Sequence, residues 1–382
     1  MPEKKNLKIL FLPTWYPSDQ NPVLGIFIKE YAWAVSLYNE VIVLYSQAEG
    51  RDIRRAGDIV SDRYEDGIRT IRTKYKKTLI PKISYLFYIR SIRRAFKTLL
   101  RKGWRPDIIH AHVYLAGGPA VILGAKYKIP VVISEHWSVF PRQALKKINL
   151  LVARYIMNKA KVILAVSRNL GNCLQSYGIK RSFEVVPNTV DTKIFYPNPR
   201  PKDNDKKNIL FAGAMKPIKG IPFLLQALVK LKQERQDFLL HILGGGECQE
   251  EYELLSKESG LGRLVEFHGV KNKQEVAEYM RRADFFILPS LWENSPCVLI
   301  EAMASGLPII ASAVGGIPEI INQDIGILVP AQHVDKLAQA LNYMLAHYRD
   351  YSSDKISQYA KDNFSYEIIG RELDNIYRNL VS

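Results

Sequence analysis

The strongest indication of the fold comes from residues 289–308, which have the sequence PSLWENSPCVLIEAMASGLP. It follows the apolar run 285–288, which predicts a buried strand of a parallel sheet that ends at Pro289. The apolar spacing and the helix formers of residues 297–304 predict a short helix after an intervening loop. A strand, a loop and a helix in this order indicate an open α/β sheet, in which ligands bind beyond the carboxyl ends of the strands.

Two glutamates lie in this stretch, Glu293 in the predicted loop and Glu301 inside the predicted helix. An ionised carboxylate only accepts hydrogen bonds, so the pair suits a ligand with many hydroxyl groups, such as a sugar and a ribose. The alternative is that Glu301 pairs locally and that Glu293 is a solvated loop residue, which is the common situation for isolated glutamates.

The surrounding residues favour the ligand-binding interpretation. The run E-N-S-P-C-V-L-I-E-A-M-A-S-G-L-P-I-I-A-S, followed by V-G-G-I-P-E-I, resembles glycosyltransferase family 4, a family of retaining nucleotide-sugar transferases. The resemblance implies the α/β architecture called GT-B, in which two Rossmann-like doubly wound domains with parallel sheets face a cleft and a C-terminal helix crosses back to the N-terminal domain. It assigns Glu293 to the transferred sugar and Glu301 to the nucleotide ribose. The neighbours that it implies in donor binding are Asn294, Ser295, Cys297 and Val298.

The length of 382 residues is too great for one ordinary core, so two domains are expected. Residues 187–207 are rich in Pro, Asn, Asp and Lys, which predicts a linker. We expect an N-terminal acceptor-binding domain at residues 1–190, a linker at 191–207 and a C-terminal nucleotide-sugar-binding domain at 208–364. Residues 365–382 are expected to cross back to the N-terminal domain.

The cysteines and the apolar runs bear on the cellular compartment. Cys173, Cys248 and Cys297 lie far apart in the sequence, with neither metal-ligand spacing nor an even number for disulfides, which favours a reducing cytoplasm. The first apolar run is short and ends at Pro13, so it predicts a first strand and not a signal peptide. No apolar run approaches the roughly 20 residues of a membrane-spanning helix.

The net charge of +16 belongs to the first half of the chain. Residues 1–200 hold 34 Lys and Arg against 14 Asp and Glu, whereas residues 201–382 hold 20 against 24. Residues 67–106 contain thirteen Lys or Arg and no acidic residue. This excess of positive charge implies an anionic partner for the first half, such as a membrane surface or a phosphorylated acceptor. Nucleic acid is not expected as a partner, because no nucleic-acid-binding motif accompanies the charge.

A basic amphipathic helix is predicted within residues 83–101, beside Tyr75, Leu79, Ile80, Tyr85 and Tyr88. Such a helix is typical of proteins that lie on an anionic membrane surface. The alternative is an ordinary crossover helix with a solvated basic face. On the membrane interpretation, the protein is cytoplasmic and peripheral on the inner face of the cell membrane.

Candidate acceptor-side residues follow the strands of the first half. Gly25 opens a predicted helix shortly after the first strand, where backbone N–H groups can meet an anion. Alternation places His110 and His112 on one side of a strand at 107–112, and His136 follows the next predicted strand. The resemblance implies His112 near the donor sugar, with a catalytic role, and His136 as a second binding residue. The alternative for each histidine is a hydrogen-bonded structural role.

A phosphate site is predicted where a strand at 208–212 meets G-A-M-K-P-I-K-G, residues 213–220. Gly213 opens the turn, and Lys219 supplies one fixed cation for a diphosphate. The family has Arg where this chain has Ala214, and we hypothesise that Lys216 replaces it. Gly245 and Gly246 end the next predicted strand and allow the backbone to approach the nucleotide. The alternative to a phosphate site is that Lys219 is an ordinary solvated lysine.

The predicted activity is that of a hexosyltransferase that needs no metal or other cofactor, because Lys219 and helix N-termini stabilise the departing diphosphate. A UDP-sugar is the favoured donor, and a GDP-sugar is the alternative. The predicted acceptor is a saccharide or a polyprenyl-diphosphate-linked saccharide in cell-surface polysaccharide synthesis. Two alternatives remain open: a sugar-nucleotide epimerase of the same fold, and a non-enzymatic glycan- or lipid-binding scaffold.

Overall fold

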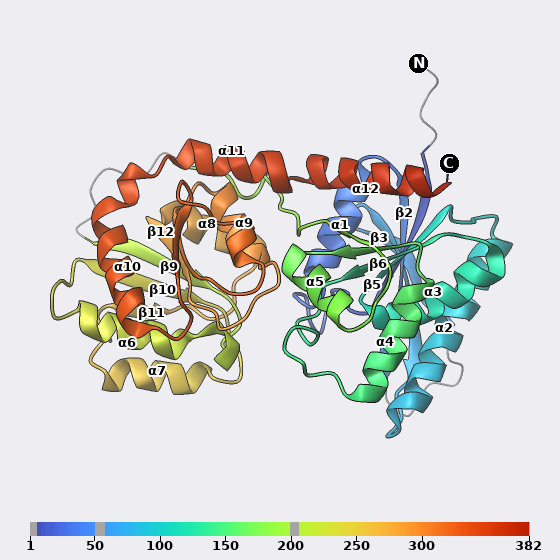
Figure 1. The fold of residues 1–382 in the computed structure, drawn as a ribbon, viewed down its shortest axis with the longest axis horizontal. Helices are drawn as coiled ribbons and strands as arrows, with labels where there is room; N and C mark the ends of the chain where they lie inside the picture. Colours follow the sequence, from blue (N-terminus) through green and yellow to red (C-terminus); the bar gives the residue numbers. More distant parts are fainter. Residues whose placement is uncertain (1–5, 50–57, 199–205, 382) are drawn as a thin grey trace, which may run out of the picture. The chain divides into compact units, whose positions relative to one another are not determined.

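A computed structural model describes residues 6–49, 58–198 and 206–381 of the chain. Its contacts divide the chain into two units, residues 1–187 with 366–382, and residues 188–365 (Figure 1). Part of the stretch expected as a linker packs on the second unit, because Val190 and Phe195 are buried in that unit's hydrophobic core. The rest of that stretch, residues 199–205, lies outside the described residues.

The first unit is built on an eight-stranded sheet in the order β3-β4-β2-β1-β5-β6-β7-β8. All neighbouring strands pair in parallel except β3 and β4, which form an antiparallel hairpin at one edge. The strands are β1 (Lys8–Pro13), β2 (Glu40–Glu49), β3 (Ile59–Glu65), β4 (Ile68–Lys76), β5 (Ile108–His112), β6 (Val131–Glu135), β7 (Val162–Ala165) and β8 (Phe183–Val185).

The edge strand β3 was not predicted from the sequence. Its side chains are mostly polar and exposed, so it lacks the apolar run that marks the other strands. The available signal was the dipeptide Asp66-Gly67, since both residues adopt positive φ angles, of 47° and 84°, in the turn of the hairpin.

Helices cover both faces of the first sheet: α1 (Ile26–Ser36), α2 (Pro81–Arg101), α3 (Tyr114–Tyr127), α4 (Lys147–Lys159), α5 (Arg168–Ser176) and α12 (Tyr366–Val381). Alternate residues of β1 serve two cores, because Leu10 and Leu12 pack with α2 and α3 while Ile9 and Phe11 pack with α1 and α12. This arrangement is that of a doubly wound domain with one core on each face.

The C-terminal helix α12 belongs to the first unit, as predicted, and lies beside α1 (Figure 1). Ile369, Leu373 and Tyr377 are fully buried on its packing face. The two helices approach closely at Gly370, where an added Cβ would lie 2.1 Å from the carbonyl oxygen of Ala34. The chain therefore leaves the second unit and completes the core of the first.

The second unit has a six-stranded sheet in the order β11-β10-β9-β12-β13-β14, in which every pairing is parallel. The strands are β9 (Lys207–Ala212), β10 (Phe238–Leu243), β11 (Val265–Phe267), β12 (Phe285–Leu288), β13 (Ile309–Ser312) and β14 (Gly326–Val329). The α-helices are α6 (Ile221–Leu231), α7 (Gln249–Glu258), α8 (Lys273–Arg282), α9 (Cys297–Ala304), α10 (Val334–His347) and α11 (Ser353–Phe364).

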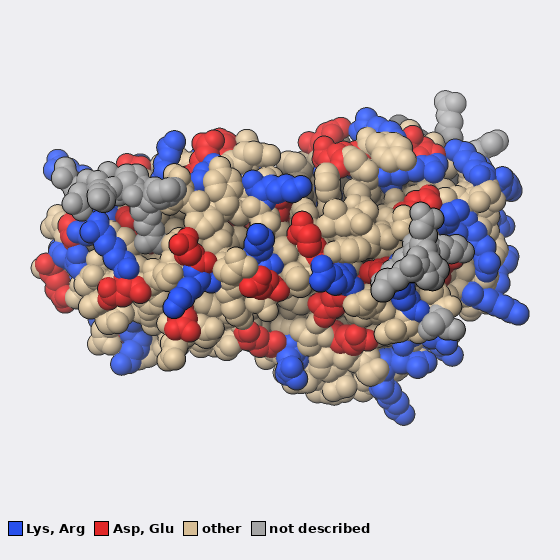
Figure 2. All heavy atoms as spheres, turned by 90° about the horizontal axis from the view of Figure 1, so that it is seen from above, with Lys and Arg blue, Asp and Glu red and all other residues tan. Residues whose placement is uncertain are grey.

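Among the described helices, none combines the length and the apolar character that crossing a membrane requires. Figure 2 shows Lys and Arg side chains crowded over part of the first unit and mixed with acidic side chains elsewhere. This distribution agrees with the excess of basic residues in the first half of the sequence.

Candidate functional site

Four loops meet beyond the carboxyl ends of strands β9, β10, β12 and β13. Backbone hydrogen bonds join them, from Met215 N to Gly245 O at 2.9 Å and from Leu291 N to Ile218 O at 2.8 Å. A third hydrogen bond runs from Gly316 N to the carbonyl oxygen of Glu293 at 3.3 Å. The strand ends and these bonds fix the loops relative to one another, which is the arrangement expected of a ligand site in an open α/β sheet.

Two glycines make the close packing of these loops possible. Gly220 has a φ of +68°, and a Cβ on it would lie 2.1 Å from the carbonyl oxygen of Pro289. Gly315 has a φ of +55°, and a Cβ on it would lie 1.6 Å from the carbonyl oxygen of Glu293. Any side chain at either position would therefore displace the loop that carries Glu293.

Lys219 and Glu293 form the charged centre of this loop cluster. The Lys219 Nζ atom lies 2.5 Å from Glu293 Oε1, and the two side chains are only 19% and 12% exposed. The Ser290 hydroxyl donates to the same carboxylate oxygen at 2.8 Å. An ammonium group has three donors, so Lys219 can bind Glu293 and an anionic ligand at the same time. The sequence predicted both residues but not their direct contact.

The other predicted residues of the second unit lie in or beside the same loops. The Gly245 carbonyl accepts from Met215, and a Cβ on Gly246 would lie 2.5 Å from the Met215 carbonyl oxygen. Gly213 lies near the stem of Lys219, since a Cβ built on it would be 3.8 Å from Lys219 Cε. Lys216 is exposed at the start of the 3-10 helix η1 (Pro217–Lys219), so its role in place of the missing Arg stays a prediction.

The segment between Glu293 and α9 is buried. Asn294 and Ser295 are 7% and 6% exposed, Cys297 and Val298 open α9 half-buried, and Glu301 is half-buried further along the same helix. The structure therefore brings Glu293, Lys219 and the start of α9 into one loop region.

Three polar atoms near this segment are buried without a hydrogen-bond partner among the described residues: Trp292 Nε1, Ser295 Oγ and Asn188 Oδ1. The Asn188 amide also donates to the Ser295 carbonyl oxygen at 2.6 Å. A buried polar atom without a partner costs about 1–3 kcal/mol, so such atoms are suited to bind a polar ligand. Neither Trp292 nor Asn188 was among the predicted site residues.

Histidines form the polar centre of the first unit. His112 Nδ1 lies 3.2 Å from His136 Nε2, and the His110 ring stacks on His112 with 4.2 Å between ring centroids. This stacking agrees with the predicted placement of His110 and His112 on one side of β5, and both residues are fully buried. His112 Nε2 is buried without a partner among the described residues, so this atom is available to a ligand.

These imidazoles are neutral near pH 7. Burial lowers the pKa of His136 to about 3. Burial also lowers the pKa of His112 well below its ordinary value, and the nearby His110 and His136 lower it further. His112 is therefore a neutral hydrogen-bonding group, and it is not an imidazolium that can donate a proton as a general acid.

Glu135 lies at the end of β6 and holds the loops around these histidines. Its carboxylate accepts from the backbone N–H groups of Tyr114, His136 and Trp137 at 3.0, 3.0 and 2.9 Å. Burial raises the pKa of this group to about 7, although the three N–H groups act in the opposite direction. Glu135 therefore fixes His136 through the backbone.

Gly25, predicted as a binding residue, has a packing role in the structure. It adopts a φ of +72° at the start of α1, and a Cβ on it would lie 2.4 Å from the carbonyl oxygen of Trp15. This close approach requires glycine whether or not an anion binds at the helix N-terminus.

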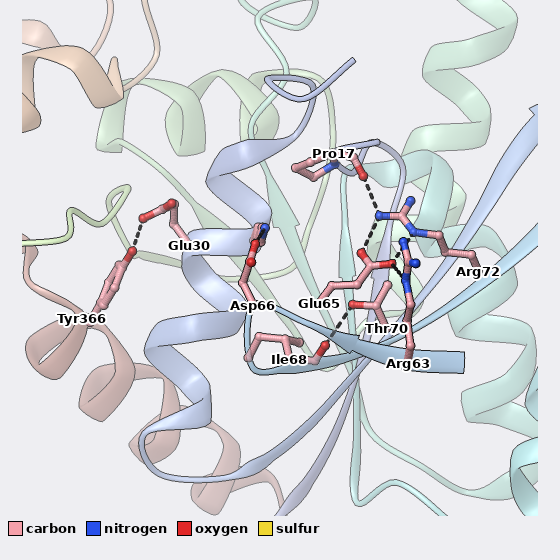
Figure 3. A network of polar contacts seen from close by, with 10 residues as sticks. Pro17, Glu30, Arg63, Glu65, Asp66, Ile68, Thr70, Arg72 and Tyr366 are labelled. Carbon is pink, nitrogen blue, oxygen red and sulfur yellow. Dashed lines mark hydrogen bonds and ion pairs between the residues drawn. The ribbon is translucent and has the colours of Figure 1, made fainter. Parts of the chain in front are cut away.

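A polar pocket of about 860 Å³ lies within the first unit, between β2, the β3–β4 hairpin and residues 16–22. Arg72 lines this pocket, and Figure 3 shows its contacts: Nε donates to Glu65 Oε1 at 2.8 Å, and Nη2 donates to the Pro17 carbonyl oxygen at 2.7 Å. Burial raises the pKa of Glu65, but the hydrogen bonds and the positive charge of Arg72 lower it more. The pKa of Glu65 therefore lies below its ordinary value. The sequence did not predict this pocket, because β3 was missed.

Two family models match successive parts of the chain. The model described as Glycosyltransferase Family 4 matches residues 33–194, and the model described as Glycosyl transferases group 1 matches residues 192–363. Together they span residues 33–363, which include most of both units.

Two curated relatives illustrate the similarity. The chain is 32% identical over 178 residues to "Uncharacterized glycosyltransferase MJ1607" of Methanocaldococcus jannaschii, a match that covers 46% of this chain and 45% of that protein. It is 26% identical over 358 residues to "Putative teichuronic acid biosynthesis glycosyltransferase TuaC" of Bacillus subtilis, with 88% of each chain covered. The match to the first relative thus spans under half of that protein.

Solved structures of similar fold include Anabaena HepE in complex with UDP-glucose. The TM-score is 0.73 at 17% sequence identity, and the match covers 98% of this chain and 100% of that one. This likeness confirms the predicted GT-B fold.

Proposed function

This chain belongs to glycosyltransferase family 4, and we propose that it moves a hexose from a UDP-sugar to a saccharide, or to a saccharide linked to polyprenyl diphosphate, with retention of anomeric configuration. The observation that carries the proposal is the Lys219–Glu293 ion pair, held by loops from several strand ends of the second unit. The similarity to TuaC, named for teichuronic acid synthesis, supports a role in polysaccharide biosynthesis.

The proposed donor site divides its work among the loop residues. Glu293 accepts hydrogen bonds from hydroxyls of the transferred sugar, and Glu301 accepts from the nucleotide ribose. Lys219 binds the diphosphate, so that its positive charge stabilises the negative charge that develops as the diphosphate leaves. With that cation and the N-terminus of α9 in place, we expect transfer without an added metal ion.

The proposed chemical step is a front-face displacement. The bond between the anomeric carbon and the diphosphate breaks while the acceptor oxygen forms its bond on the same face of the sugar. The departing phosphate oxygen takes the proton of the acceptor hydroxyl. Because His112 is neutral and buried, it contributes a hydrogen bond through Nε2 and not a proton.

Replacement of Glu293 tests the donor assignment. Glu293→Gln keeps the volume of the side chain but loses its charge, and we expect at least a hundredfold loss of transfer, comparable to the loss of one oxyanion-hole donor. The exposed Glu258 on α7 offers a matched control, Glu258→Gln, which should leave transfer unchanged. Full transfer by Glu293→Gln would remove the proposed sugar contact.

We place the saccharide acceptor in the polar pocket around Arg72. The pocket mixes paired charges with the exposed ring of Tyr64, which is 74% exposed, and sugars bind to such combinations of hydrogen-bonding groups and aromatic faces. Tyr64→Ala should raise KM for the acceptor several-fold and leave KM for the nucleotide sugar unchanged. Tyr343→Ala, at an exposed tyrosine of α10, is the control. Equal acceptor KM in both variants would exclude this pocket.

Membrane association is proposed to use two helices that flank α3. A Cβ on Gly118 of α3 would meet both Tyr85 of α2, at 1.9 Å, and Ile156 of α4, at 3.6 Å, so both helices pack on one region of α3. Large apolar side chains are exposed on this part of the molecule: Leu79 and Ile80 just before α2, Ile83 and Leu86 near its start, and Ile148, Leu151, Val152 and Tyr155 on α4. Further along α2, the exposed face carries Arg90, Arg93, Arg94, Lys97 and Arg101.

The structure corrects part of the predicted membrane-binding face. Tyr88 is buried in the core, and the Tyr85 hydroxyl donates to the Leu115 carbonyl oxygen at 2.8 Å. These two rings anchor α2 to the sheet and to α3. The surface proposed for membrane contact therefore consists of the exposed apolar residues and the basic face, without Tyr85 and Tyr88.

Cosedimentation with vesicles that contain anionic phospholipid tests this surface. The triple variant Leu79→Ser, Ile83→Ser and Leu86→Ser should bind at least tenfold more weakly, and neutralising Arg90, Arg93, Arg94 and Lys97 should also weaken binding, because each basic residue contributes about 1 kcal/mol near an anionic surface. Leu254→Ser with Val270→Ser, at exposed apolar positions of the second unit, is the control. Unchanged binding by both test variants would remove the membrane proposal.

The two alternative functions differ in their products. An epimerase would convert the nucleotide sugar without an acceptor, and a scaffold would not consume it. Release of UDP coupled to a glycosylated lipid or saccharide product therefore distinguishes all three.

A further inference from the structure

Two histidines and a glutamate converge at the edge of the second sheet, on strands β10 and β11. His241 lies in β10, Glu266 is its register partner in β11, and His268 follows directly after β11. Within the described part of the chain, this trio is the one group of three potential metal ligands whose donor atoms all lie within 4.8 Å of one another. None of the three belongs to the proposed donor-binding residues.

The spacing of the three donor atoms fits one face of a coordination tetrahedron. His241 Nδ1 lies 3.0 Å from His268 Nε2, and these atoms lie 3.6 and 3.5 Å from Glu266 Oε2. Bonds of about 2.0–2.1 Å at tetrahedral angles place neighbouring ligand atoms about 3.3–3.4 Å apart. The observed distances lie on either side of this value, so small side-chain rotations suffice to seat a cation.

The other nitrogen of each ring is already engaged. His241 Nε2 lies 3.1 Å from Asn208 Oδ1, and His268 Nδ1 lies 3.2 Å from the Tyr279 hydroxyl. If each of these nitrogens donates its N–H to the neighbouring oxygen, the lone pairs of His241 Nδ1 and His268 Nε2 point toward one another. Metal-binding histidines commonly use this arrangement, in which an outer partner fixes the tautomer and orients the ring.

Burial and charge also suit a cation. The side chains of His241 and His268 are 16% and 20% exposed, and that of Glu266 is 52% exposed, so the trio is rigid on one side and open to solvent on the other. Glu266 adds a carboxylate to the two imidazoles, and an anionic ligand favours a cation at this position. Lys271 is the positively charged residue that acts electrostatically on His268.

We propose that His241 Nδ1, His268 Nε2 and Glu266 Oε2 bind a divalent transition-metal ion of the Zn²⁺ class, with water completing the tetrahedron. Imidazole and carboxylate are ligands that this class accepts. The ion would tie the three-residue edge strand β11 to β10 and secure the start of the segment that leads to α8. Its role is structural, so the inference does not depend on the proposed transfer reaction.

Binding of Co²⁺ to the full chain, purified without a histidine tag and treated with a chelator, tests the proposal. We expect one equivalent of Co²⁺ with the visible absorption of a tetrahedral site, displaced by Zn²⁺, and a Zn²⁺-dependent rise in Tm. Glu266→Gln, at a side chain that is half exposed, should weaken binding at least tenfold without unfolding the protein. His268→Gln should abolish binding.

The matched control is His347→Gln, since His347 ends α10, is half-exposed and pairs with Asp350. Absence of tetrahedral Co²⁺ absorption in the unmodified protein would overturn the proposal and leave His241 and His268 as a hydrogen-bonded pair. Equal Co²⁺ affinity in the unmodified protein and in Glu266→Gln and His268→Gln would overturn it as well, because the ion would then bind elsewhere.

Discussion

Lys219 and Glu293 lie 74 residues apart in the sequence, and their charged groups are 2.5 Å apart in the structure. Lys219 ends a 3-10 helix after β9, and Glu293 lies in the loop after β12. Lys219, which is proposed to bind the diphosphate, thus positions Glu293, which is proposed to bind the sugar. We therefore expect the two side chains to act as one unit in transfer.

The coupling of Lys219 and Glu293 predicts non-additive kinetics. Lys219→Met and Glu293→Gln should each lower kcat/KM by at least about a hundredfold, and the double variant should be little slower than the worse single variant. Steady-state rates of the four proteins measure this coupling, with Lys257→Met on α7 as the control. Losses that multiply in the double variant would show that the two residues act independently.

The contact between Gly315 and Glu293 predicts a loss of activity on a small substitution. Gly315→Ala should destabilise the second unit by about 1–3 kcal/mol through strain and should lower transfer, because the new Cβ displaces the Glu293 backbone. The control is Gly262→Ala, since a Cβ there meets nothing within 4 Å. Denaturant unfolding and initial rates provide the two measurements. Equal activity in the two variants would contradict the proposed tight packing.

The burial of Glu135 predicts a specific dependence of stability on pH. Its folded pKa of about 7 lies above the ordinary value of 4.5, so its contribution to stability is complete below pH 4.5 and is lost as the pH rises through 7. The loss amounts to about 3 kcal/mol at 1.36 kcal/mol per pKa unit. The free energy of unfolding should therefore fall from pH 5 to pH 8 in the unmodified protein more steeply than in Glu135→Gln. Parallel pH profiles would show that Glu135 titrates normally.

The neutral histidines predict a flat pH response. His112→Gln should lower kcat/KM about ten- to a hundredfold, because one hydrogen bond to the reacting ligands is lost. The shape of the pH–rate profile between pH 6 and 8 should be the same in both proteins, since the pKa of His112 lies well below this range. A step near pH 6.5 that disappears in His112→Gln would identify His112 as a titrating acid or base.

Much of the fold was predictable because local pattern and final structure agree. The buried strand β12 and helix α9 have the predicted bounds, since an apolar run ended by Pro289 and a run of helix formers leave little choice. His110 and His112 share a face because side chains alternate along a strand. β3 was missed because its polar residues are held in the sheet by pairing with β4 and not by burial.

The candidate site was predictable in its residues but not in its contacts. Glu293 and Lys219 were each recognised from short motifs, but their ion pair depends on how two loops from different strands pack through Gly220 and Gly315. The trio of His241, Glu266 and His268 depends on the register between β10 and β11, which the sequence alone does not reveal. Long-range register and loop packing explain why both sets of contacts were missed.

The most direct measurement is the thermal shift of the full protein with UDP, GDP and their sugar derivatives, without added metal. A ligand that binds only the folded state stabilises it by about 2.7 kcal/mol at a hundredfold excess over its Kd. We predict that UDP and a UDP-sugar raise Tm and that Lys219→Met removes most of the shift. If no nucleotide changes Tm, or if the shift in Lys219→Met equals that of the unmodified protein, these loops do not bind a nucleotide sugar.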